Sequence, residues 1–290
     1  MGGLMHPRFR PMNRHMKTKL IPIALSSLFI SCLVSSNTQA QSAFTGFYGQ
    51  ISSGYESNQL TGISGSSVEI PSSGVNVDIS GPSQNFGGAP LVFGLGYYWQ
   101  LNSSWLLGIG ADYSALSQTS PSQQSNLTNA PGNNLIPAGV TMTANGSNSQ
   151  LSQRYNLFIS PGYLVDKDKL LYIKAGYSHV TGQAKRATSV TATVNGRSVT
   201  VPSTTAGTSN STGDGGYLVG LGYKQIITGG LYGFVEANYM GYGTLRETYT
   251  SPAKSAAETA VGVTNSSVTQ ITGSRSLGTY QFFIGLGYAF

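Results

Sequence analysis

Apolar residues alternate with small or polar residues along eight short segments of the chain. The segments lie near residues 46–56, 90–100, 105–115, 153–163, 170–180, 216–226, 231–241 and 280–290. In the last segment, one face carries Tyr280, Phe282, Ile284, Leu286, Tyr288 and Phe290, whereas the other carries Gln281, Phe283, Gly285, Gly287 and Ala289. A period of two residues is typical of a β-strand. The pattern therefore predicts eight strands of about 11 residues, the length that a tilted strand needs to cross a bilayer.

The connections between these segments differ sharply in length. Three are short, at residues 101–104, 165–169 and 227–230, and the long polar connections alternate with them. Long loops without structure are uncommon inside a compact domain. Outer-membrane barrels, by contrast, combine short periplasmic turns with long extracellular loops. We therefore expect an all-β fold, namely a transmembrane antiparallel up-and-down β-barrel of eight strands with both ends in the periplasm.

The two faces of the strands indicate which side of this barrel meets lipid. In segment 90–100 the large apolar residues share one face, and glycines such as Gly94 and Gly96 occupy the other. Aromatic residues also gather at the two ends of the segments, where membrane interfaces place them. A large apolar face outside and a small or polar face inside suit a membrane barrel. A secreted soluble β-sandwich, with its apolar face inward, is the alternative.

One long connection contains a second alternating pattern. Residues 189–201 alternate on both sides of Asn195-Gly196, and this dipeptide is a strong signal for a two-residue hairpin turn. Each arm is short and lacks the aromatic residues of a spanning strand. We predict a ribbon above the membrane, and the alternative is a pair of additional strands in a ten-stranded barrel.

The N-terminus predicts export. The first 19 positions hold five basic residues and no acidic one, an apolar run follows from 20 to 34, and a polar stretch ends at Ala40. This order is that of a signal peptide covering residues 1–40, with the barrel domain at 41–290. Met16 is an alternative start. A lipoprotein anchored through Cys32 is the alternative to cleavage after Ala40.

Removal of the leader changes the charge and the cysteine content. Five of the 16 Lys and Arg residues and none of the ten acidic residues lie within 1–40. Residues 41–290 therefore hold eleven basic and ten acidic residues, a formal net charge of +1. This balance does not indicate a nucleic-acid partner. Cys32 is the only cysteine, so the exported chain has no disulfide and no thiolate metal site.

Short glycine-aromatic motifs complete the pattern. They are Gly94-Leu95-Gly96-Tyr97, Gly108-Ile109-Gly110-Ala111-Asp112-Tyr113, Pro161-Gly162-Tyr163 and Gly285-Leu286-Gly287-Tyr288-Ala289-Phe290. This arrangement resembles the small outer-membrane β-barrels of Gram-negative bacteria, such as the OmpA transmembrane domain and the opacity-type surface proteins. The resemblance implies location in the outer membrane, with its lipid and lipopolysaccharide as surroundings. It also implies that Tyr288 and Phe290 form a signal for the barrel-assembly machinery.

Four charged residues are expected to face the lumen. They are Asp112, Arg154, Lys174 and Glu236. Counting heights along the strands predicts that Arg154 pairs with Asp112 and that Lys174 pairs with Glu236. The charges sum to zero, which favours a plugged lumen, because an eight-stranded barrel has an interior that side chains just fill. A small porin-like channel is the alternative.

Evidence for catalysis in the sequence is restricted to His179. His179-Val180-Thr181 distantly resembles the His-x-Ser of outer-membrane lipid A deacylases, but a threonine replaces the serine and no acid is placed beside the histidine. One histidine without cysteine cannot build a metal cluster. We therefore expect no cofactor, no metal and no enzymatic activity. The predicted role is envelope structure or surface interaction, with a host or surface ligand bound through the loops.

Overall fold

The computed structural model describes residues 42–62, 66–69, 77–129, 136–185, 187–202, 212–249 and 270–290. All of them belong to one compact unit, Gln41–Phe290. The predicted signal peptide at 1–40 lies outside the described residues. Within the described ranges, no helix is long and apolar enough to span a membrane.

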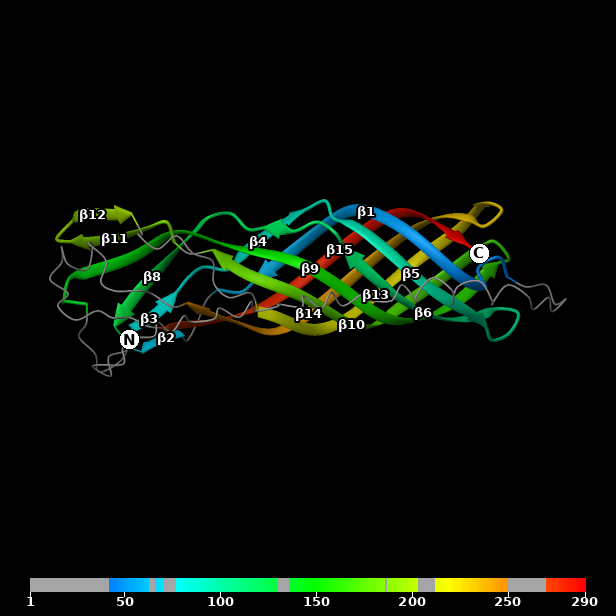
Figure 1. Cartoon of the computed structure of the whole chain (residues 1–290), viewed down its shortest axis with the longest axis horizontal. Helices are drawn as coiled ribbons and strands as arrows, with labels where there is room; N and C mark the ends of the chain where they lie inside the picture. Colours follow the sequence, from blue (N-terminus) through cyan, green and yellow to red (C-terminus); the bar gives the residue numbers. More distant parts are fainter. Residues whose placement is uncertain are drawn as a thin grey trace, which may run out of the picture. The chain divides into compact units, whose positions relative to one another are not determined.

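Eight antiparallel strands close into a ring (Figure 1). In order around the ring they are β1 (Gly46–Leu60), β5 (Leu91–Gln100), β6 (Trp105–Ser114), β9 (Val140–Asp166), β10 (Lys169–Lys185), β13 (Thr212–Thr228), β14 (Leu231–Tyr249) and β15 (Gln270–Ala289). β15 pairs with β1 from Tyr48↔Ala289 to Leu60↔Leu277 and so closes the sheet. The predicted eight-stranded barrel is confirmed, and the ten-stranded alternative is wrong.

Several barrel strands continue well past the predicted length. β9 has 27 residues, and its N-terminal half belongs to a second group of strands. The remaining strands are β2 (Ser66–Glu69), β3 (Val77–Ser80), β4 (Gln84–Gly88), β7 (Gln118–Thr119), β8 (Gln123–Asn129), β11 (Ser189–Val194) and β12 (Arg197–Pro202). β3, β8, the N-terminal half of β9, β11 and β12 pair side by side, and we call them the outer sheet. The predicted hairpin at Asn195-Gly196 is present as β11–β12.

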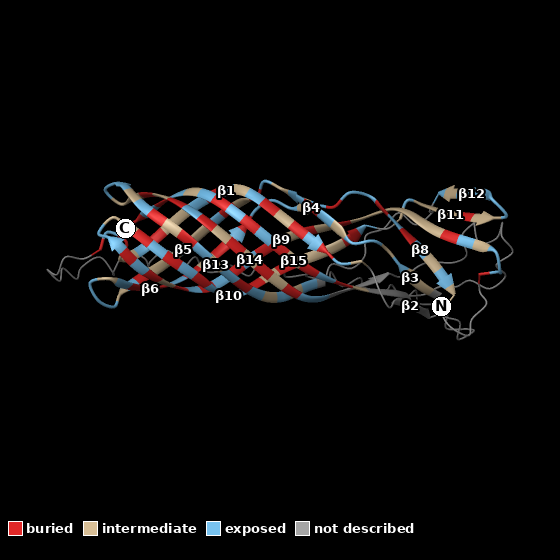
Figure 2. Cartoon of the chain, turned by 180° about the vertical axis from the view of Figure 1, so that it is seen from behind, coloured by how far each residue is buried: buried red, intermediate tan, exposed pale blue. Residues whose placement is uncertain are grey.

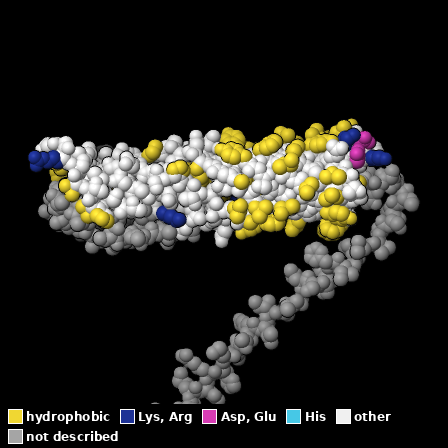
Figure 3. Space-filling view, turned by 90° about the horizontal axis from the view of Figure 1, so that it is seen from above, with side chains coloured by type: hydrophobic (Ala, Val, Ile, Leu, Met, Phe, Trp, Pro, Cys, Tyr) yellow, Lys and Arg dark blue, Asp and Glu magenta, His cyan; other side chains and the backbone are white. Residues whose placement is uncertain are grey.

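The barrel is apolar outside and mixed inside. Along the barrel strands, buried and exposed residues alternate (Figure 2). Leu95 and Ile284 are both 66% exposed, whereas Tyr98 and Phe283 are buried. Figure 3 shows hydrophobic side chains gathered over one part of the surface. A large exposed apolar area suits lipid rather than water, so the soluble-sandwich alternative is wrong.

Aromatic rings mark the two ends of this apolar belt. Near the short turns, the Phe47 and Tyr97 ring centroids lie 4.9 Å apart, and those of Tyr288 and Phe290 lie 5.1 Å apart. At the other end, the ring centroids of Tyr239 and Tyr280 lie 4.8 Å apart. Amphipathic rings prefer the interface between hydrocarbon and water. The belt therefore has the two aromatic girdles of a membrane barrel.

β9 contains two irregularities that matter for the lumen. Gln153 has a φ of 49°, in the left-handed region that favours glycine, and the β9–β10 register shifts at this point. On the periplasmic side of this bulge, Arg154 and Asn156 face the lumen. On its extracellular side, Leu151 faces the lumen. Pro161, which cannot donate a hydrogen bond, falls in a gap of the β9–β10 ladder while it remains paired with Leu107 of β6.

Candidate functional site in the barrel lumen

The lumen is closed at its periplasmic end by a layer of apolar and aromatic side chains. This lower layer consists of Phe44, Tyr48, Tyr98, Leu106, Leu164, Leu170, Tyr172, Tyr232, Phe234 and Ala289. Glycines on neighbouring strands give its rings their space. A Cβ built on Gly222 would lie 2.3 Å from Tyr172 Cζ, and one on Gly287 would lie 2.3 Å from Tyr232 Cζ. The inward glycines thus allow tyrosine rings to lie flat against the wall and fill the interior.

Lys174 lies at the centre of the next layer. Its Nζ is 2.6 Å from Asp112 Oδ2 and 2.9 Å from Glu236 Oε1. Glu236 also accepts hydrogen bonds from the Tyr172 hydroxyl at 2.7 Å and from Asn238 Nδ2 at 2.8 Å. We call these five residues the Lys174 cluster. All of them are buried, so the ions are held by each other and by hydrogen bonds rather than by water.

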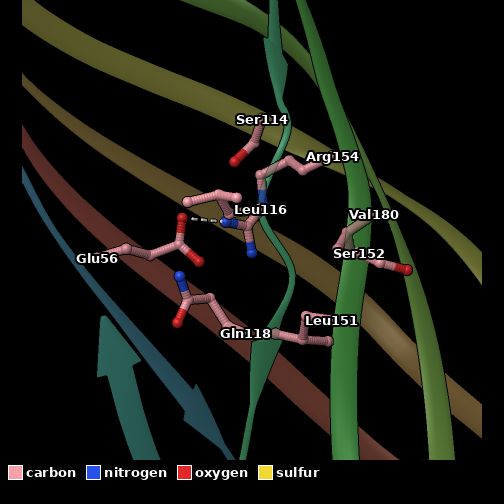
Figure 4. Close-up of a pocket in the computed structure, with 8 residues that line it drawn as sticks. All are labelled: Glu56, Ser114, Leu116, Gln118, Leu151, Ser152, Arg154 and Val180. Atoms are coloured by element: carbon pink, nitrogen blue, oxygen red, sulfur yellow. Dashed lines mark ion pairs between the residues drawn. The ribbon is translucent and has the colours of Figure 1, made fainter. Parts of the chain in front are cut away.

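Arg154 organises a second cluster on the extracellular side of the first. Its Nη1 lies 2.5 Å from Glu56 Oε2. Its Nε donates to the Tyr242 hydroxyl at 3.0 Å, and its Nη2 donates to Asn58 Oδ1 at 3.0 Å and Thr279 Oγ1 at 3.2 Å. We call these five residues the Arg154 cluster. Figure 4 shows Glu56 and Arg154 pointing toward one another across a small pocket that Ser114, Leu151 and Val180 also line.

The predicted partner of Arg154 was wrong. Arg154 lies opposite Ser114 in the β6–β9 register, and Asp112 lies opposite Asn156. Asp112 instead forms an ion pair with Lys174, for which Glu236 was the only predicted partner. The partner of Arg154 is Glu56, which shares the inward face of β1 with Ser52. That period of two along β1 was available in the sequence and would have identified it.

A third buried cation, Lys224, was also missed. It is 2% exposed, and its Nζ lies 4.0 Å from the Tyr48 ring centroid and between 4.9 and 5.9 Å from four further rings of the lower layer. Its hydrogen-bond acceptor is Gln50 Oε1 at 3.1 Å, which also accepts from the Tyr232 hydroxyl. Lys224 continues the inward series of Gly220 and Gly222, so alternation along β13 contained the signal. The affinity of aromatic faces for cations explains how the ammonium is accommodated.

His179 lies on the outward side of β10. Its ring stacks on that of Tyr155, with centroids 4.8 Å apart. The Thr181 hydroxyl donates to Gln153 Oε1 at 3.4 Å and not to the histidine. Asp214 of β13 lies next to His179 in the register, but no hydrogen bond among the described residues joins it or a hydroxyl nucleophile to the imidazole in the way a hydrolytic triad requires. No group of three or more His, Cys, Asp or Glu residues that could hold a metal is found among the described residues either.

No family model and no curated protein matches the chain. Among solved structures, the chain is similar to Ail, the attachment invasion locus protein of Yersinia pestis, with 13% identity and a TM-score of 0.32 over 85% of this chain and 99% of that chain. It is similar to the outer membrane protease OmpT of Escherichia coli, with 11% identity and a TM-score of 0.41 over 88% and 100% of the two chains. The outer membrane protein OprG of Pseudomonas aeruginosa shares 10% identity and a TM-score of 0.48 over 85% and 96%.

Likeness at these values carries no information about activity, and the assignment comes from the molecule's own geometry. The ring is closed, so no strand edge of the barrel is left unpaired in a bilayer. The outer surface carries an apolar belt between two aromatic girdles. These are the features that a bilayer imposes on a spanning sheet, and the chain is an eight-stranded outer-membrane β-barrel.

Proposed function

We propose that this chain is a closed, non-conducting barrel that anchors the outer sheet at the cell surface. The observation that carries the proposal is the burial of the lumen charges. Asp112, Arg154, Lys174 and Glu236 are each no more than 5% exposed. In a water-filled channel such charges would be hydrated, whereas here each contacts an opposite charge.

The layers of the lumen support the same role. The lower layer, the Lys174 cluster and the Arg154 cluster follow one another along the lumen. A further apolar group, including Leu151, Phe158, Val180 and Leu277, packs around the two clusters, and the Phe158 ring centroid lies 3.9 Å from Lys174 Nζ. An eight-stranded barrel has just enough interior for its side chains. The role at the surface is then envelope structure or interaction with a surface or host ligand, through strands that lipopolysaccharide surrounds.

Conductance in planar bilayers tests this proposal directly. We expect the purified wild-type barrel to conduct ions poorly or not at all. Arg154→Ala should raise the conductance, because it leaves Glu56 buried without its partner and opens space for water. Arg197→Ala, the same change in the β11–β12 hairpin, is the matched control and should leave the conductance unchanged. Large, stable wild-type channels that Arg154→Ala does not alter would establish the porin-like alternative instead.

We also propose that Tyr288 and Phe290 act as the assembly signal. The two rings contact each other on the outer surface, where Phe290 is 75% exposed, and the Phe290 N–H donates to Phe47 O at 2.9 Å. Phe290→Asp should greatly lower the amount of folded barrel in the outer membrane, measured as heat-modifiable migration on gels. Phe290→Tyr is the control that keeps an aromatic ring. Normal assembly of Phe290→Asp would remove this role.

A further inference from the structure

One face of the outer sheet carries neither charge nor aromatic rings across β8, β9, β11 and β12; the same face of β3 carries Asp78, opposite Thr128. The register places Asn126, Thr143, Thr191 and Thr200 side by side, and Thr141, Thr193 and Ser198 in the next row. We call these seven residues the hydroxyl face. The opposite face is covered, because Met142 and Ala192 are buried there with Ile136, and Leu127, Val140 and Val190 pack against them.

The side chains of the hydroxyl face are held in position before any ligand arrives. Thr191 Oγ1 lies 2.9 Å from Thr200 Oγ1, and Thr193 Oγ1 lies 2.8 Å from Ser198 Oγ. Asn145 Nδ2 donates to Thr191 Oγ1 at 2.9 Å. Threonine is also restricted at χ1. A partner that binds this face would therefore lose little side-chain entropy from the protein.

The chemistry of the face selects against most partners. Protein interfaces depend on buried Tyr, Trp and Arg anchors, and none is among these seven residues. An anionic ligand would need Lys or Arg, which the face also lacks. Each hydroxyl, in contrast, both donates and accepts hydrogen bonds, which matches the hydroxyl groups of a neutral sugar. Because the hydroxyls repeat in rows at the strand spacing of about 4.8 Å, the face suits a repeating chain of such sugars.

The position of the face indicates where such a chain would come from. β9 extends as one strand from Val140, the neighbour of Thr141, to Asp166 at the periplasmic turn. Thr143 on this face lies roughly 36 Å along β9 from Arg154 in the lumen, at a strand rise of about 3.3 Å per residue. The face therefore stands well outside the outer leaflet, at the height of the sugar chains of lipopolysaccharide. Resting on the surface role proposed above, we propose that the hydroxyl face binds the neutral saccharide chain of lipopolysaccharide in the same membrane.

Hydrogen exchange in vesicles tests this inference. The barrel is reconstituted with rough lipopolysaccharide, which lacks the O-chain, or with smooth lipopolysaccharide that carries a neutral mannose-polymer O-chain. In smooth vesicles we expect the amides of residues 189–202 to exchange at least about threefold more slowly, as ligand occupancy requires. The triple variant Thr143→Val/Thr191→Val/Thr193→Val should lose this difference. The triple serine variant at the same positions should keep it, because it retains the hydroxyls.

The comparison is made within each variant, so local destabilisation of the outer sheet would appear already in rough vesicles. If the valine variant exchanges faster there, the single variant Thr191→Val replaces it. Equal exchange of the wild-type hairpin in rough and smooth vesicles would overturn the inference, as would slowing that survives in the valine variant. Both outcomes leave the conductance test untouched, so failure of this inference and failure of the closed-barrel proposal are distinguishable.

Discussion

Two lysines lie buried in the same lumen, and their surroundings differ. Lys174 contacts two carboxylates, Asp112 and Glu236, and both lysines are 2% exposed. No carboxylate among the described residues lies within ion-pair distance of Lys224; its ammonium lies among aromatic rings and donates to the Gln50 amide oxygen. One cation is thus held by ion pairs, and the other by ring faces and a single neutral acceptor.

This difference shows that the burial of a charged side chain does not by itself determine how much its removal lowers the free energy of unfolding. Removing one member of a buried ion pair leaves its partner charged and dehydrated, which is costly. Removing a cation from a cage of rings leaves no such orphan, and it also abolishes the cost of dehydrating the cation. Two substitutions with the same chemistry should therefore have very different effects on stability.

The largest expected effect is that of Lys174→Met. It leaves Asp112 and Glu236 facing each other without a cation, and should lower the free energy of unfolding by about 3–5 kcal/mol. The measurement is urea unfolding of the barrel in lipid vesicles. Lys169→Met, the same change at the exposed periplasmic turn, is the matched control. A Lys174→Met barrel as stable as this control would show that the ion pairs do not hold the lumen together.

A much smaller change is expected for Lys224→Met. The linear methionine side chain can occupy the apolar cage, and no carboxylate in contact is left unpaired, so the free energy of unfolding should stay within about 1 kcal/mol of wild type. The same urea titration measures it. A loss as large as that of Lys174→Met would mean that the long-range attraction between Lys224 and the carboxylates dominates, and the contrast between the lysines would disappear.

The smallest effect is expected for the exposed ion pair of Asp166 and Lys169, whose charged atoms are 3.5 Å apart. The backbone N–H of Lys167, aided by the Lys169 ammonium, holds the pKa of the Asp166 carboxyl below its ordinary value. Its contribution to stability is therefore present above the unfolded-state pKa of about 3.9 and is lost as the pH falls through the lower folded-state value. Asp166→Asn should thus lower the urea midpoint slightly near neutral pH.

Repeating the urea titration of wild type and Asp166→Asn at low pH provides the control for this prediction. Once the pH is low enough to protonate Asp166 in the folded state, wild type and Asp166→Asn should unfold at the same urea concentration. A difference that persists or grows in acid would show that the substitution changes stability by a route other than the charge of Asp166.

Alternation was sufficient to predict the barrel, because a bilayer demands apolar residues at every second position of a spanning strand. Leu95 and Ile284 are exposed on the outer surface, and Asp112, Arg154, Lys174 and Glu236 are buried. The outer sheet was not predicted apart from its hairpin. The segment Gln123–Asn129 is polar at nearly every position, so the pattern does not separate its faces.

The partners inside the lumen were harder to predict than the faces. Counting residues along each strand predicts the height of a side chain in the lumen only to within a residue or two. The bulge in β9 also shifts the register near Arg154. Glu56 and Lys224 continue the inward positions of their strands, but they lie near the ends of the predicted segments. Contacts between side chains on strands that are not neighbours depend on the tilt of the whole ring, which no local pattern contains.

The bulge at Gln153 also constrains any chimera in which the extracellular part of this protein is replaced. Below it, the even-numbered residues of β9 face the interior, and above it the odd-numbered ones do, from Leu151 to Ser149. The barrel part of β9 and the stretch directly above the bulge are therefore in opposite phase. The even-numbered Met142 is buried again in the outer sheet, after a second register shift near Gly146. A graft cut above Gln153 must keep this extra residue, because without it every side chain of the transplanted strand would turn to the wrong face.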